Sequence, residues 1–306
     1  MKRDPTMALP YVLITPARNE ADHIEKTIQS VIAQTVLPLR WIIVSDGSTD
    51  GTDEIVEKYL PGRPWMELIK LPPRAERNFA AKVHAVRTGQ ARMAELDYEV
   101  IVNLDGDVSF PPDYFEFLIG RFEADPELGC GGTHYTEGDF HSFTDSYINV
   151  HHVNGQIQAF RRRCFDEIGG YQPVKGGGID WIAVTTARMK GWKTYSFSER
   201  VFHHHRVMGT AGGSVLQARF HYGKKDYFLG GHPLWQIARS TFQLAKKPYI
   251  VGGLALLAGY TWCWITGVQR PVSKELMAFH RGEQMARLRG LVFDRLGRRR
   301  VQAQDA

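Results

Sequence analysis

Residues 100–107 have the sequence VIVNLDGD, in which an apolar run typical of a buried parallel strand ends at two carboxylates one residue apart. In open α/β sheets, ligands bind beyond the carboxyl ends of such strands. Gly106 lets the chain turn, so Asp105 and Asp107 can face one oxygen-liganded cation, Mg²⁺ or Mn²⁺. Because Asp-Gly-Asp is also ordinary turn chemistry, this interpretation depends on the rest of the chain.

The segments before this strand alternate between strand and helix patterns. Short β-rich runs at residues 11–15, 41–44 and 66–71 are each followed by a segment with apolar side chains on one helical face. This order predicts an α/β fold with a Rossmann-like, mostly parallel sheet flanked by helices. Neither Gly-x-Gly-x-x-Gly nor Gly-x-x-x-x-Gly-Lys follows the first strand, which excludes the dinucleotide-binding and P-loop classes.

The composition is that of a globular protein. The chain has 306 residues, of which 43% are hydrophobic and 23% charged, and this is enough for one large domain or a domain with an appendage. Its three cysteines have no metal-type spacing, so we expect reduced, structural thiols. No apolar segment of the secretory type precedes the first strand, so we expect the main domain to stay in the cytosol.

The last part of the chain differs from the rest in charge and hydropathy. From Gln269 onward there are nine basic and four acidic residues, so the tail carries the whole net charge of +5. The tail follows residues 249–268, which are mainly apolar and as a helix are long enough for a bilayer. Basic residues flank both ends, which favours a re-entrant or surface-lying segment over a span.

We therefore expect an anionic membrane surface as the partner of this region. Nucleic acid is not expected, because the tail has no evident aromatic stacking pattern and follows an apolar segment. The alternative for residues 249–268 is that they pack on the domain as a core hairpin.

Three short motifs carry a resemblance to a known family. They are PARNE at residues 16–20, VSDGSTD at residues 44–50 and DGD at residues 105–107. In this order and spacing they resemble the family 2 glycosyltransferases, which have a GT-A fold, and the resemblance covers about residues 10–210. It implies a GT-A domain over residues 1–230, with a donor half at about 10–107 and an acceptor half at about 108–230. A helical, membrane-associating region is expected over residues 231–306.

The resemblance implies a nucleotide site made from the first two motifs. In that family the loop after the first strand wraps the nucleobase and ribose, so we expect contacts from Pro16, Ala17, Arg18 and Glu20. Asp46 is expected to accept the N–H of uracil, which indicates a UDP-sugar. The alternative for Asp46 is an ordinary turn residue before a helix.

Basic residues and the strand-end carboxylates complete this expected site. By resemblance, Asp105 faces the ribose and the metal shell, while Asp107 ligates the cation that bridges the two phosphates. Arg77 and Lys82 lie where the family often has a basic residue near the donor, and a solvated helix face is the alternative for either.

The segment FHHHR, residues 202–206, follows a strand predicted over residues 193–197. In this segment we expect His204 as a third metal ligand and Arg206 on the diphosphate. The glycine-rich residues 209–214 are expected to close over bound nucleotide, and an ordinary surface loop is the alternative.

Asp180 is the candidate catalytic base. It ends the sequence GGGID at residues 176–180 and precedes a helix predicted over residues 182–190. This segment resembles the family segment whose acidic residue takes the proton from the acceptor hydroxyl. Ile179 occupies a position at which the family commonly has glutamate, and N-capping of the helix is the alternative role of Asp180.

The resemblance implies an inverting, metal-assisted glycosyltransferase at the cytoplasmic face of the cell membrane. It would move a sugar from a nucleotide-sugar donor to a hydroxyl of a lipid-linked or glycan acceptor. The Gln-x-x-Arg-Trp motif of processive members is altered in LQARF, residues 216–220, which favours single addition over chain extrusion. The alternatives are a nucleotidyltransferase with a related sheet, and a non-catalytic membrane scaffold that retains the fold.

Overall fold

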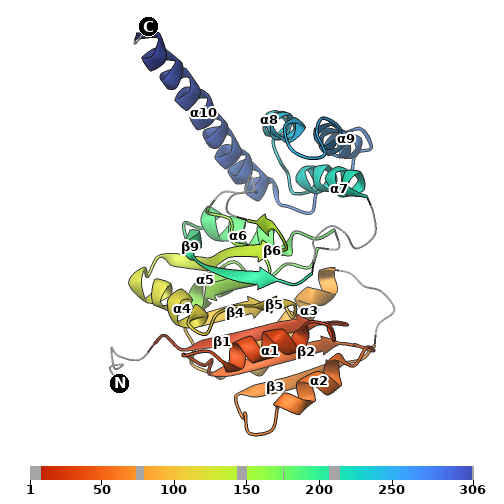
Figure 1. Ribbon diagram of the computed structural model, residues 1–306, viewed down its shortest axis with the longest axis vertical. Coiled ribbons are helices and arrows are strands. Elements are labelled where there is room, and N and C mark those ends of the chain that lie inside the picture. The colour runs from red at the N-terminus through yellow and green to blue at the C-terminus, as the bar shows by residue number, and fades with distance from the viewer. Residues whose placement is uncertain (1–7, 74–78, 143–149, 175, 207–213, 305–306) are drawn as a thin grey trace. The chain divides into compact units, whose positions relative to one another are not determined.

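The chain folds into two compact units, Met1–Val207 and Met208–Ala306 (Figure 1). The computed structural model describes residues 8–73, 79–142, 150–174, 176–206 and 214–304. The division follows Val207, whereas the sequence predicted a domain boundary after residue 230. The difference arises because helix α7 (Val215–Phe228) packs on helix α9 (Val251–Ile265) of the second unit.

The first half of the sheet has the predicted alternation of strands and helices. Four strands pair in parallel in the order β3-β2-β1-β4. Their bounds are β1 Tyr11–Ala17, β2 Arg40–Asp46, β3 Met66–Leu71 and β4 Val100–Leu104. The connecting helices are α1 Ile24–Ile32, α2 Thr52–Tyr59 and α3 Phe79–Arg92. Every strand and helix predicted up to residue 104 is therefore confirmed.

The second half of the sheet is mixed, so the expected mostly parallel sheet is correct only for β1–β4. Its strands continue the order as β8-β6-β9-β5, with β7 beside β6. β8 is antiparallel to β4 and to β6, β5 is antiparallel to β9, and β6 and β9 are parallel. The strand bounds are β5 Val108–Ser109, β6 Leu128–Glu137, β7 Phe140–His141, β8 Ile157–Arg161 and β9 Lys193–His204.

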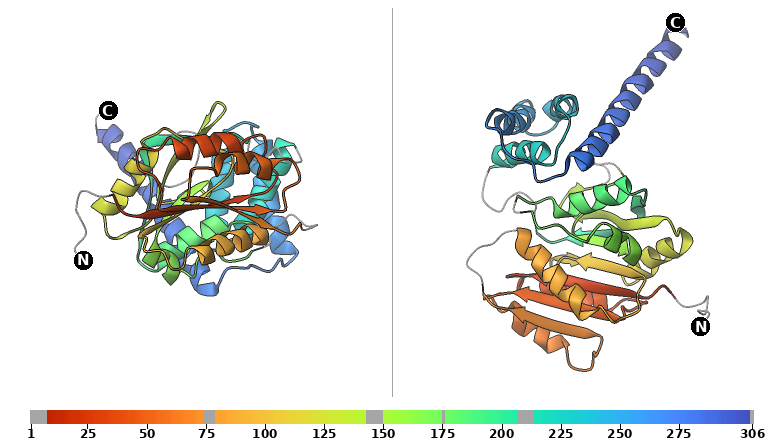
Figure 2. Two further views of the ribbon diagram at one scale, coloured as in Figure 1. Left: turned by 90° about the horizontal axis from the view of Figure 1, so that it is seen from below. Right: turned by 180° about the vertical axis from the view of Figure 1, so that it is seen from behind.

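The central strands are buried on both faces, which explains their nearly continuous apolar sequences. Helices α1 and α2 lie on one face of the sheet and α3 lies on the other (Figure 2). Leu13, Ile43 and Val102 belong to one apolar cluster with residues of α1 and of α4 (Tyr114–Ala124). This packing fixes the carboxyl end of β4, from which Asp105 and Asp107 follow. Helices α5 (Arg162–Glu167) and α6 (Ile179–Met189) complete the first unit.

The second unit is helical and contains α7, α8 (Pro233–Leu244), α9 and α10 (Lys274–Gln304). Its helices approach each other through glycines: a Cβ atom on Gly223 would overlap the carbonyl of Leu256, and one on Gly259 would overlap the carbonyl of Phe220. None of the helices in the described part of the chain is long and apolar enough to cross a membrane. Within the apolar stretch 249–268, helix α9 covers only Val251–Ile265, so it is shorter than a helix over the whole stretch would be.

Candidate functional site

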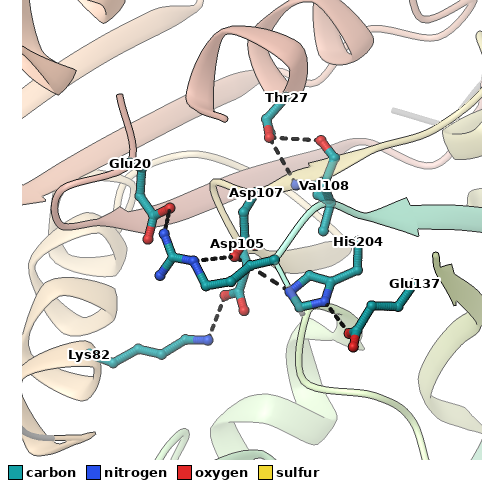
Figure 3. Close-up of polar contacts among 9 residues, drawn as sticks. Glu20, Thr27, Lys82, Asp105, Asp107, Val108, Glu137 and His204 are labelled. Carbon is teal, nitrogen blue, oxygen red and sulfur yellow. Dashed lines mark hydrogen bonds and ion pairs between the residues drawn. The ribbon is translucent and has the colours of Figure 1, made fainter. Parts of the chain in front are cut away.

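The backbone of residues 105–108 is held by hydrogen bonds from three other parts of the chain. The Asp105 amide donates to the carbonyl of Gln156 (2.8 Å), and the amide of His205 donates to the carbonyl of Asp107 (2.9 Å). The Thr27 hydroxyl of α1 contacts both the carbonyl (2.7 Å) and the amide (3.2 Å) of Val108 (Figure 3). The two carboxylates therefore have a fixed place at the end of β4.

Lys82 reaches this pair from α3. Its Nζ atom lies 2.5 Å from Oδ1 of Asp105, so Lys82 faces the carboxylates and is not part of a solvated helix face (Figure 3). Burial raises the pKa of Asp105 above its ordinary value, and the charge of Lys82 offsets part of this rise. Burial alone would lower the pKa of Lys82, but Asp105 raises it more, so the ammonium charge is retained.

His204 is the histidine of the FHHHR cluster that reaches Asp107. Strand β9 continues through His204, beyond the strand predicted over residues 193–197, and pairs His204 with Val108. The Nε2 atom of His204 lies 3.4 Å from Oδ2 of Asp107, and its Nδ1 atom lies 2.8 Å from Oε2 of Glu137 (Figure 3). Burial lowers the pKa of His204, but the two carboxylates raise it further, so the net direction is upward.

The neighbouring histidines have different environments. Nε2 of His205 lies 2.9 Å from the Ser109 hydroxyl, and burial together with the charge of Lys26 lowers the pKa of His205 to about 4. Nδ1 of His203 lies 3.1 Å from the hydroxyl of Thr136. Among the three, His204 therefore has the contacts expected of a residue in the carboxylate site.

Arg206 connects the end of β9 to the loop after β1. Its Nη2 atom lies 2.5 Å from Oε2 of Glu20, and its Nε atom lies 3.6 Å from Oδ2 of Asp107. Although burial acts in the other direction, the hydrogen bond from His204 and the charges of His204 and Arg206 lower the pKa of Asp107. Asp107 is therefore ionised, with positive charge on two sides.

The site has one polar atom that the described residues leave unsatisfied. Oδ1 of Asp107 is buried and has no hydrogen-bond partner among them. Such an atom is costly unless a cation or a water satisfies it. No group of three or more His, Cys, Asp and Glu residues in the described ranges already has the arrangement of a metal site. The oxygen atoms of Asp105 and Asp107 are nevertheless of the type that a hard divalent cation prefers, and His204 adds an imidazole nitrogen beside them.

The first two sequence motifs form two loops that lie side by side in the candidate site. Because β1 and β2 are parallel neighbours, with Ala17 opposite Ser45, their following loops lie side by side. The loops are joined by hydrogen bonds in both directions: the Thr49 amide donates to Oδ1 of Asn19 (2.9 Å), and the Glu20 amide donates to the Thr52 hydroxyl (2.8 Å). Pro16 and Ala17 are the last residues of β1, directly before the first of these loops.

Asp46 is the last residue of β2 and is only 5% exposed. Nη1 of Arg18 lies 3.5 Å from its Oδ2 atom. Gly47 follows with a φ of +67°, and a Cβ atom there would lie 2.6 Å from Cα of Pro73, so glycine is required at this turn. The N-cap of α2 is Gly51, so Asp46 does not cap that helix.

Asp180 lies in the first turn of α6, whose N-cap is Gly178. Asp180 therefore does not N-cap this helix, which was its alternative role. A Cβ atom on Gly155 would lie 2.8 Å from Oδ2 of Asp180, so the carboxylate rests directly against this glycine. The charge of Asp180 also raises the pKa of Lys82. Gln156, the residue after Gly155, accepts the hydrogen bond from the Asp105 amide. Asp180 therefore belongs to the same site as the strand-end carboxylates.

Three contributors to the site were not found from the sequence: Thr27, Glu137 and Gly155. None of them belongs to one of the three motifs, and each acts through a contact with a residue distant along the chain. These contacts depend on the tertiary fold, which the sequence alone did not give. Arg77, considered a second basic residue near the donor, and residues 209–213 lie outside the described residues.

Solved structures share this fold. The mannosyltransferase PcManGT from Pyrobaculum calidifontis, in complex with GDP-Man and Mn²⁺, has a TM-score of 0.58 at 20% identity, over 93% of this chain and 82% of that chain. S. aureus TarS in complex with UDP-GlcNAc has a TM-score of 0.52 at 13% identity, over 89% of this chain and 78% of that chain. The curled mixed sheet flanked by helices is therefore the GT-A fold expected from the sequence.

Sequence comparison leads to the same group of enzymes. The glucosyl-dolichyl phosphate glucuronosyltransferase of Haloferax volcanii is 24% identical over 190 residues, which are 56% of this chain and 58% of that protein. The chain thus spans less than two thirds of the length of this relative. The model of glycosyl transferase family 2 matches residues 12–176, which contain the three motifs and most of the site. Since this match covers more than half of the chain, the protein belongs to glycosyl transferase family 2.

Proposed function

We propose that this chain is an inverting transferase that adds one sugar from a UDP-sugar to a hydroxyl of a lipid-linked or glycan acceptor. The observation that carries the proposal is the convergence of Asp105, Asp107 and Asp180 with the basic side chains of Lys82 and Arg206. Membership of the family favours this function over the nucleotidyltransferase and the scaffold considered from the sequence.

We assign the nucleotide site to the two loops that follow β1 and β2. Pro16, Ala17, Arg18 and Glu20 would surround the base and ribose, since they follow or end β1 beside Asp46. The buried carboxylate of Asp46 suits the single N–H of uracil. A carboxylate also accepts from guanine, and the related folds bind either nucleotide, so the nucleotide has to be tested directly.

A divalent cation, Mn²⁺ or Mg²⁺, is assigned to Asp107, Asp105 and His204. The unsatisfied Oδ1 atom of Asp107 supports this assignment. When bound, the cation would supply Lewis-acid stabilisation of the charge that develops on the leaving diphosphate. Lys82 and Arg206 would contact the diphosphate oxygens, because each already places a positive charge beside one of the two strand-end carboxylates.

Asp180 would act as the general base. Its carboxylate takes the proton of the acceptor hydroxyl as that oxygen forms a bond to the anomeric carbon. The bond from the anomeric carbon to the diphosphate oxygen breaks at the same time, and its electron pair leaves with UDP. Because attack and departure occur on opposite faces of the sugar, the anomeric configuration is inverted. No covalent enzyme intermediate is required.

The acceptor would be presented at the cytoplasmic face of a membrane. The outward face of α9 supports this, because it is apolar along its whole length, with Val251, Leu254, Trp262 and Ile265 exposed at helical spacing. The opposite face packs through Gly252, Gly253, Leu256, Gly259, Tyr260 and Cys263. The same helix therefore packs within its unit and leaves an apolar face exposed.

The charges around this helix suit anionic lipid. No acidic residue occurs between residues 227 and 273, while Lys246 and Lys247 precede α9 and Arg270 follows it. Lysine and arginine beside an apolar face are the features with which surface-lying helices bind anionic lipid headgroups. We place α9 in the plane of the membrane surface rather than across it.

A nucleotide-sugar panel tests the proposed reaction. The chain is incubated with UDP-sugars and GDP-sugars in the presence of Mn²⁺, and release of the free nucleotide is measured by chromatography. We expect UDP release from at least one UDP-sugar. Turnover of GDP-sugars alone would overturn the UDP assignment. Binding of nucleotide-sugars without any release, with or without membrane lipid extract as acceptor, would favour the scaffold.

A further inference from the structure

Glu137 lies beside the proposed cation site and belongs to none of the motifs. It is the last residue of β6, and its side chain is 10% exposed. Its Oε2 atom lies 2.8 Å from Nδ1 of His204, while Nε2 of the same ring lies 3.4 Å from Oδ2 of Asp107. One imidazole thus lies between the carboxylate of a strand residue, Glu137, and that of Asp107 in the turn between β4 and β5 (Figure 3).

The strand register holds Glu137 in this place. β6 and β9 are parallel, with Tyr135 opposite Phe202 and Thr136 opposite His203, so the next residues along the two strands are Glu137 and His204. On its other side Glu137 pairs with Phe140 of β7. The carboxylate is therefore carried by backbone that pairs with β7 at Glu137 and with β9 one residue earlier, which suits a residue that orients another.

Aromatic packing restrains the His204 ring as well. The ring of Tyr135 lies 5.6 Å from that of Phe202 in a stacked arrangement and 6.2 Å from that of His204 at an interplanar angle of 80°. Alternate residues of a strand share one face, so Tyr135 and Glu137 contact the ring from the same strand. The ring has a packed face, one hydrogen-bonded nitrogen and one nitrogen directed at Asp107.

We propose that Glu137 is a positioning residue that makes His204 a ligand through Nε2. A neutral imidazole carries a proton on one nitrogen and a lone pair on the other. Because Glu137 accepts from Nδ1–H, it selects the form whose lone pair is on Nε2, the nitrogen that faces Asp107. A carboxylate on the outer nitrogen of a ligating histidine fixes the ring and increases its basicity, and its loss typically weakens metal affinity about 10- to 100-fold.

This inference rests on the proposed cation site, so the experiment measures Mn²⁺ binding and not turnover. Free Mn²⁺ is followed by electron paramagnetic resonance in titrations of the full chain with MnCl₂. We expect Glu137→Ala to weaken Mn²⁺ binding about 10- to 100-fold. Glu137→Gln keeps an acceptor for Nδ1–H, so we expect it to recover most of the lost affinity. It also serves as the informative variant if Glu137→Ala does not fold.

The matched control is Glu199→Ala, which removes a glutamate that pairs with Arg121 from elsewhere on β9. It should leave Mn²⁺ affinity unchanged. A structural role for Glu137 would lower the melting temperature without changing Mn²⁺ affinity, and that result would overturn the inference. If Asp107→Asn also left Mn²⁺ binding intact, the cation site itself would be wrong, whereas weakening by Asp107→Asn alone would reject only the role of Glu137.

A spectroscopic measurement tests the tautomer directly. In ¹⁵N-histidine-labelled protein with Mg²⁺, we expect the His204 ring to carry its proton on Nδ1. In Glu137→Ala this preference should be reduced, with signals of both tautomers or of exchange between them. A wild-type ring protonated on Nε2 in the presence of Mg²⁺ would contradict the proposal.

Discussion

The two halves of the sheet build their parts of the site in different ways. In the parallel half, Asp46 and the loop of residues 16–20 follow neighbouring strands, and short hydrogen bonds join the two loops. In the mixed half, strand register brings Glu137 and His204 together, while Asp180 comes from the first turn of α6. Under the proposed function, nucleotide binding depends on local motifs and the chemistry depends on contacts between distant segments.

The largest effect that this comparison predicts is on Asp180→Asn. An amide cannot take the acceptor proton, so we expect the turnover rate to fall on the order of 10²- to 10⁴-fold. UDP affinity, measured by calorimetry, should remain unchanged because Asp180 belongs to the mixed half. Near-normal turnover in this variant would overturn the assignment of Asp180 as the base.

Asp46→Ala should produce the opposite pattern. Loss of a charge-assisted hydrogen bond of roughly 1.5 to 3 kcal/mol predicts UDP binding about 10- to 100-fold weaker. Turnover at saturating UDP-sugar should change little, since Asp46 is proposed to contact the base and not the reacting atoms. A variant with unchanged UDP affinity, or one whose main defect is in turnover, would break the division between the two halves.

The smallest effect is expected on the outward face of α9. Leu254→Ala should weaken binding to anionic vesicles about tenfold, since part of a leucine side chain is worth roughly 1 to 2 kcal/mol when it leaves water. The control is Leu37→Ala, because Leu37 is 45% exposed in the first unit and Leu254 is 55% exposed in the second. Co-sedimentation that is equal for both variants and the wild type would reject this face as the membrane contact.

The sequence predicted much of the parallel half because its signals are local. An apolar strand followed by a polar loop identifies a strand end, where ligands bind in an open α/β sheet, so Asp105 and Asp107 were predicted from the residues themselves and Asp46 from the resemblance. Gly47 shows why the residue after Asp46 is restricted to glycine, since any side chain there would overlap Pro73. Lys82 was found by resemblance, and the structure adds its contact with Asp105.

The mixed half was harder to predict because its contacts depend on pairing. The strand predicted to end at residue 197 continues to His204, since β6 and β5 supply partners for its second part. That segment has charged and histidine residues in place of an apolar pattern, so periodicity could not reveal it. Glu137 had no local signal at all. Its proximity to His204 is a consequence of the β6–β9 register.

Metal-dependent UDP binding tests the central claim most directly. Calorimetry would compare UDP binding with Mn²⁺ and with a chelator, in the wild type and in Asp107→Asn. The account predicts that Mn²⁺ tightens UDP binding in the wild type, that Asp107→Asn removes this gain, and that metal-free UDP affinity stays within a few-fold in both. An Asp107→Asn protein in which Mn²⁺ still tightens UDP binding as in the wild type would contradict the account.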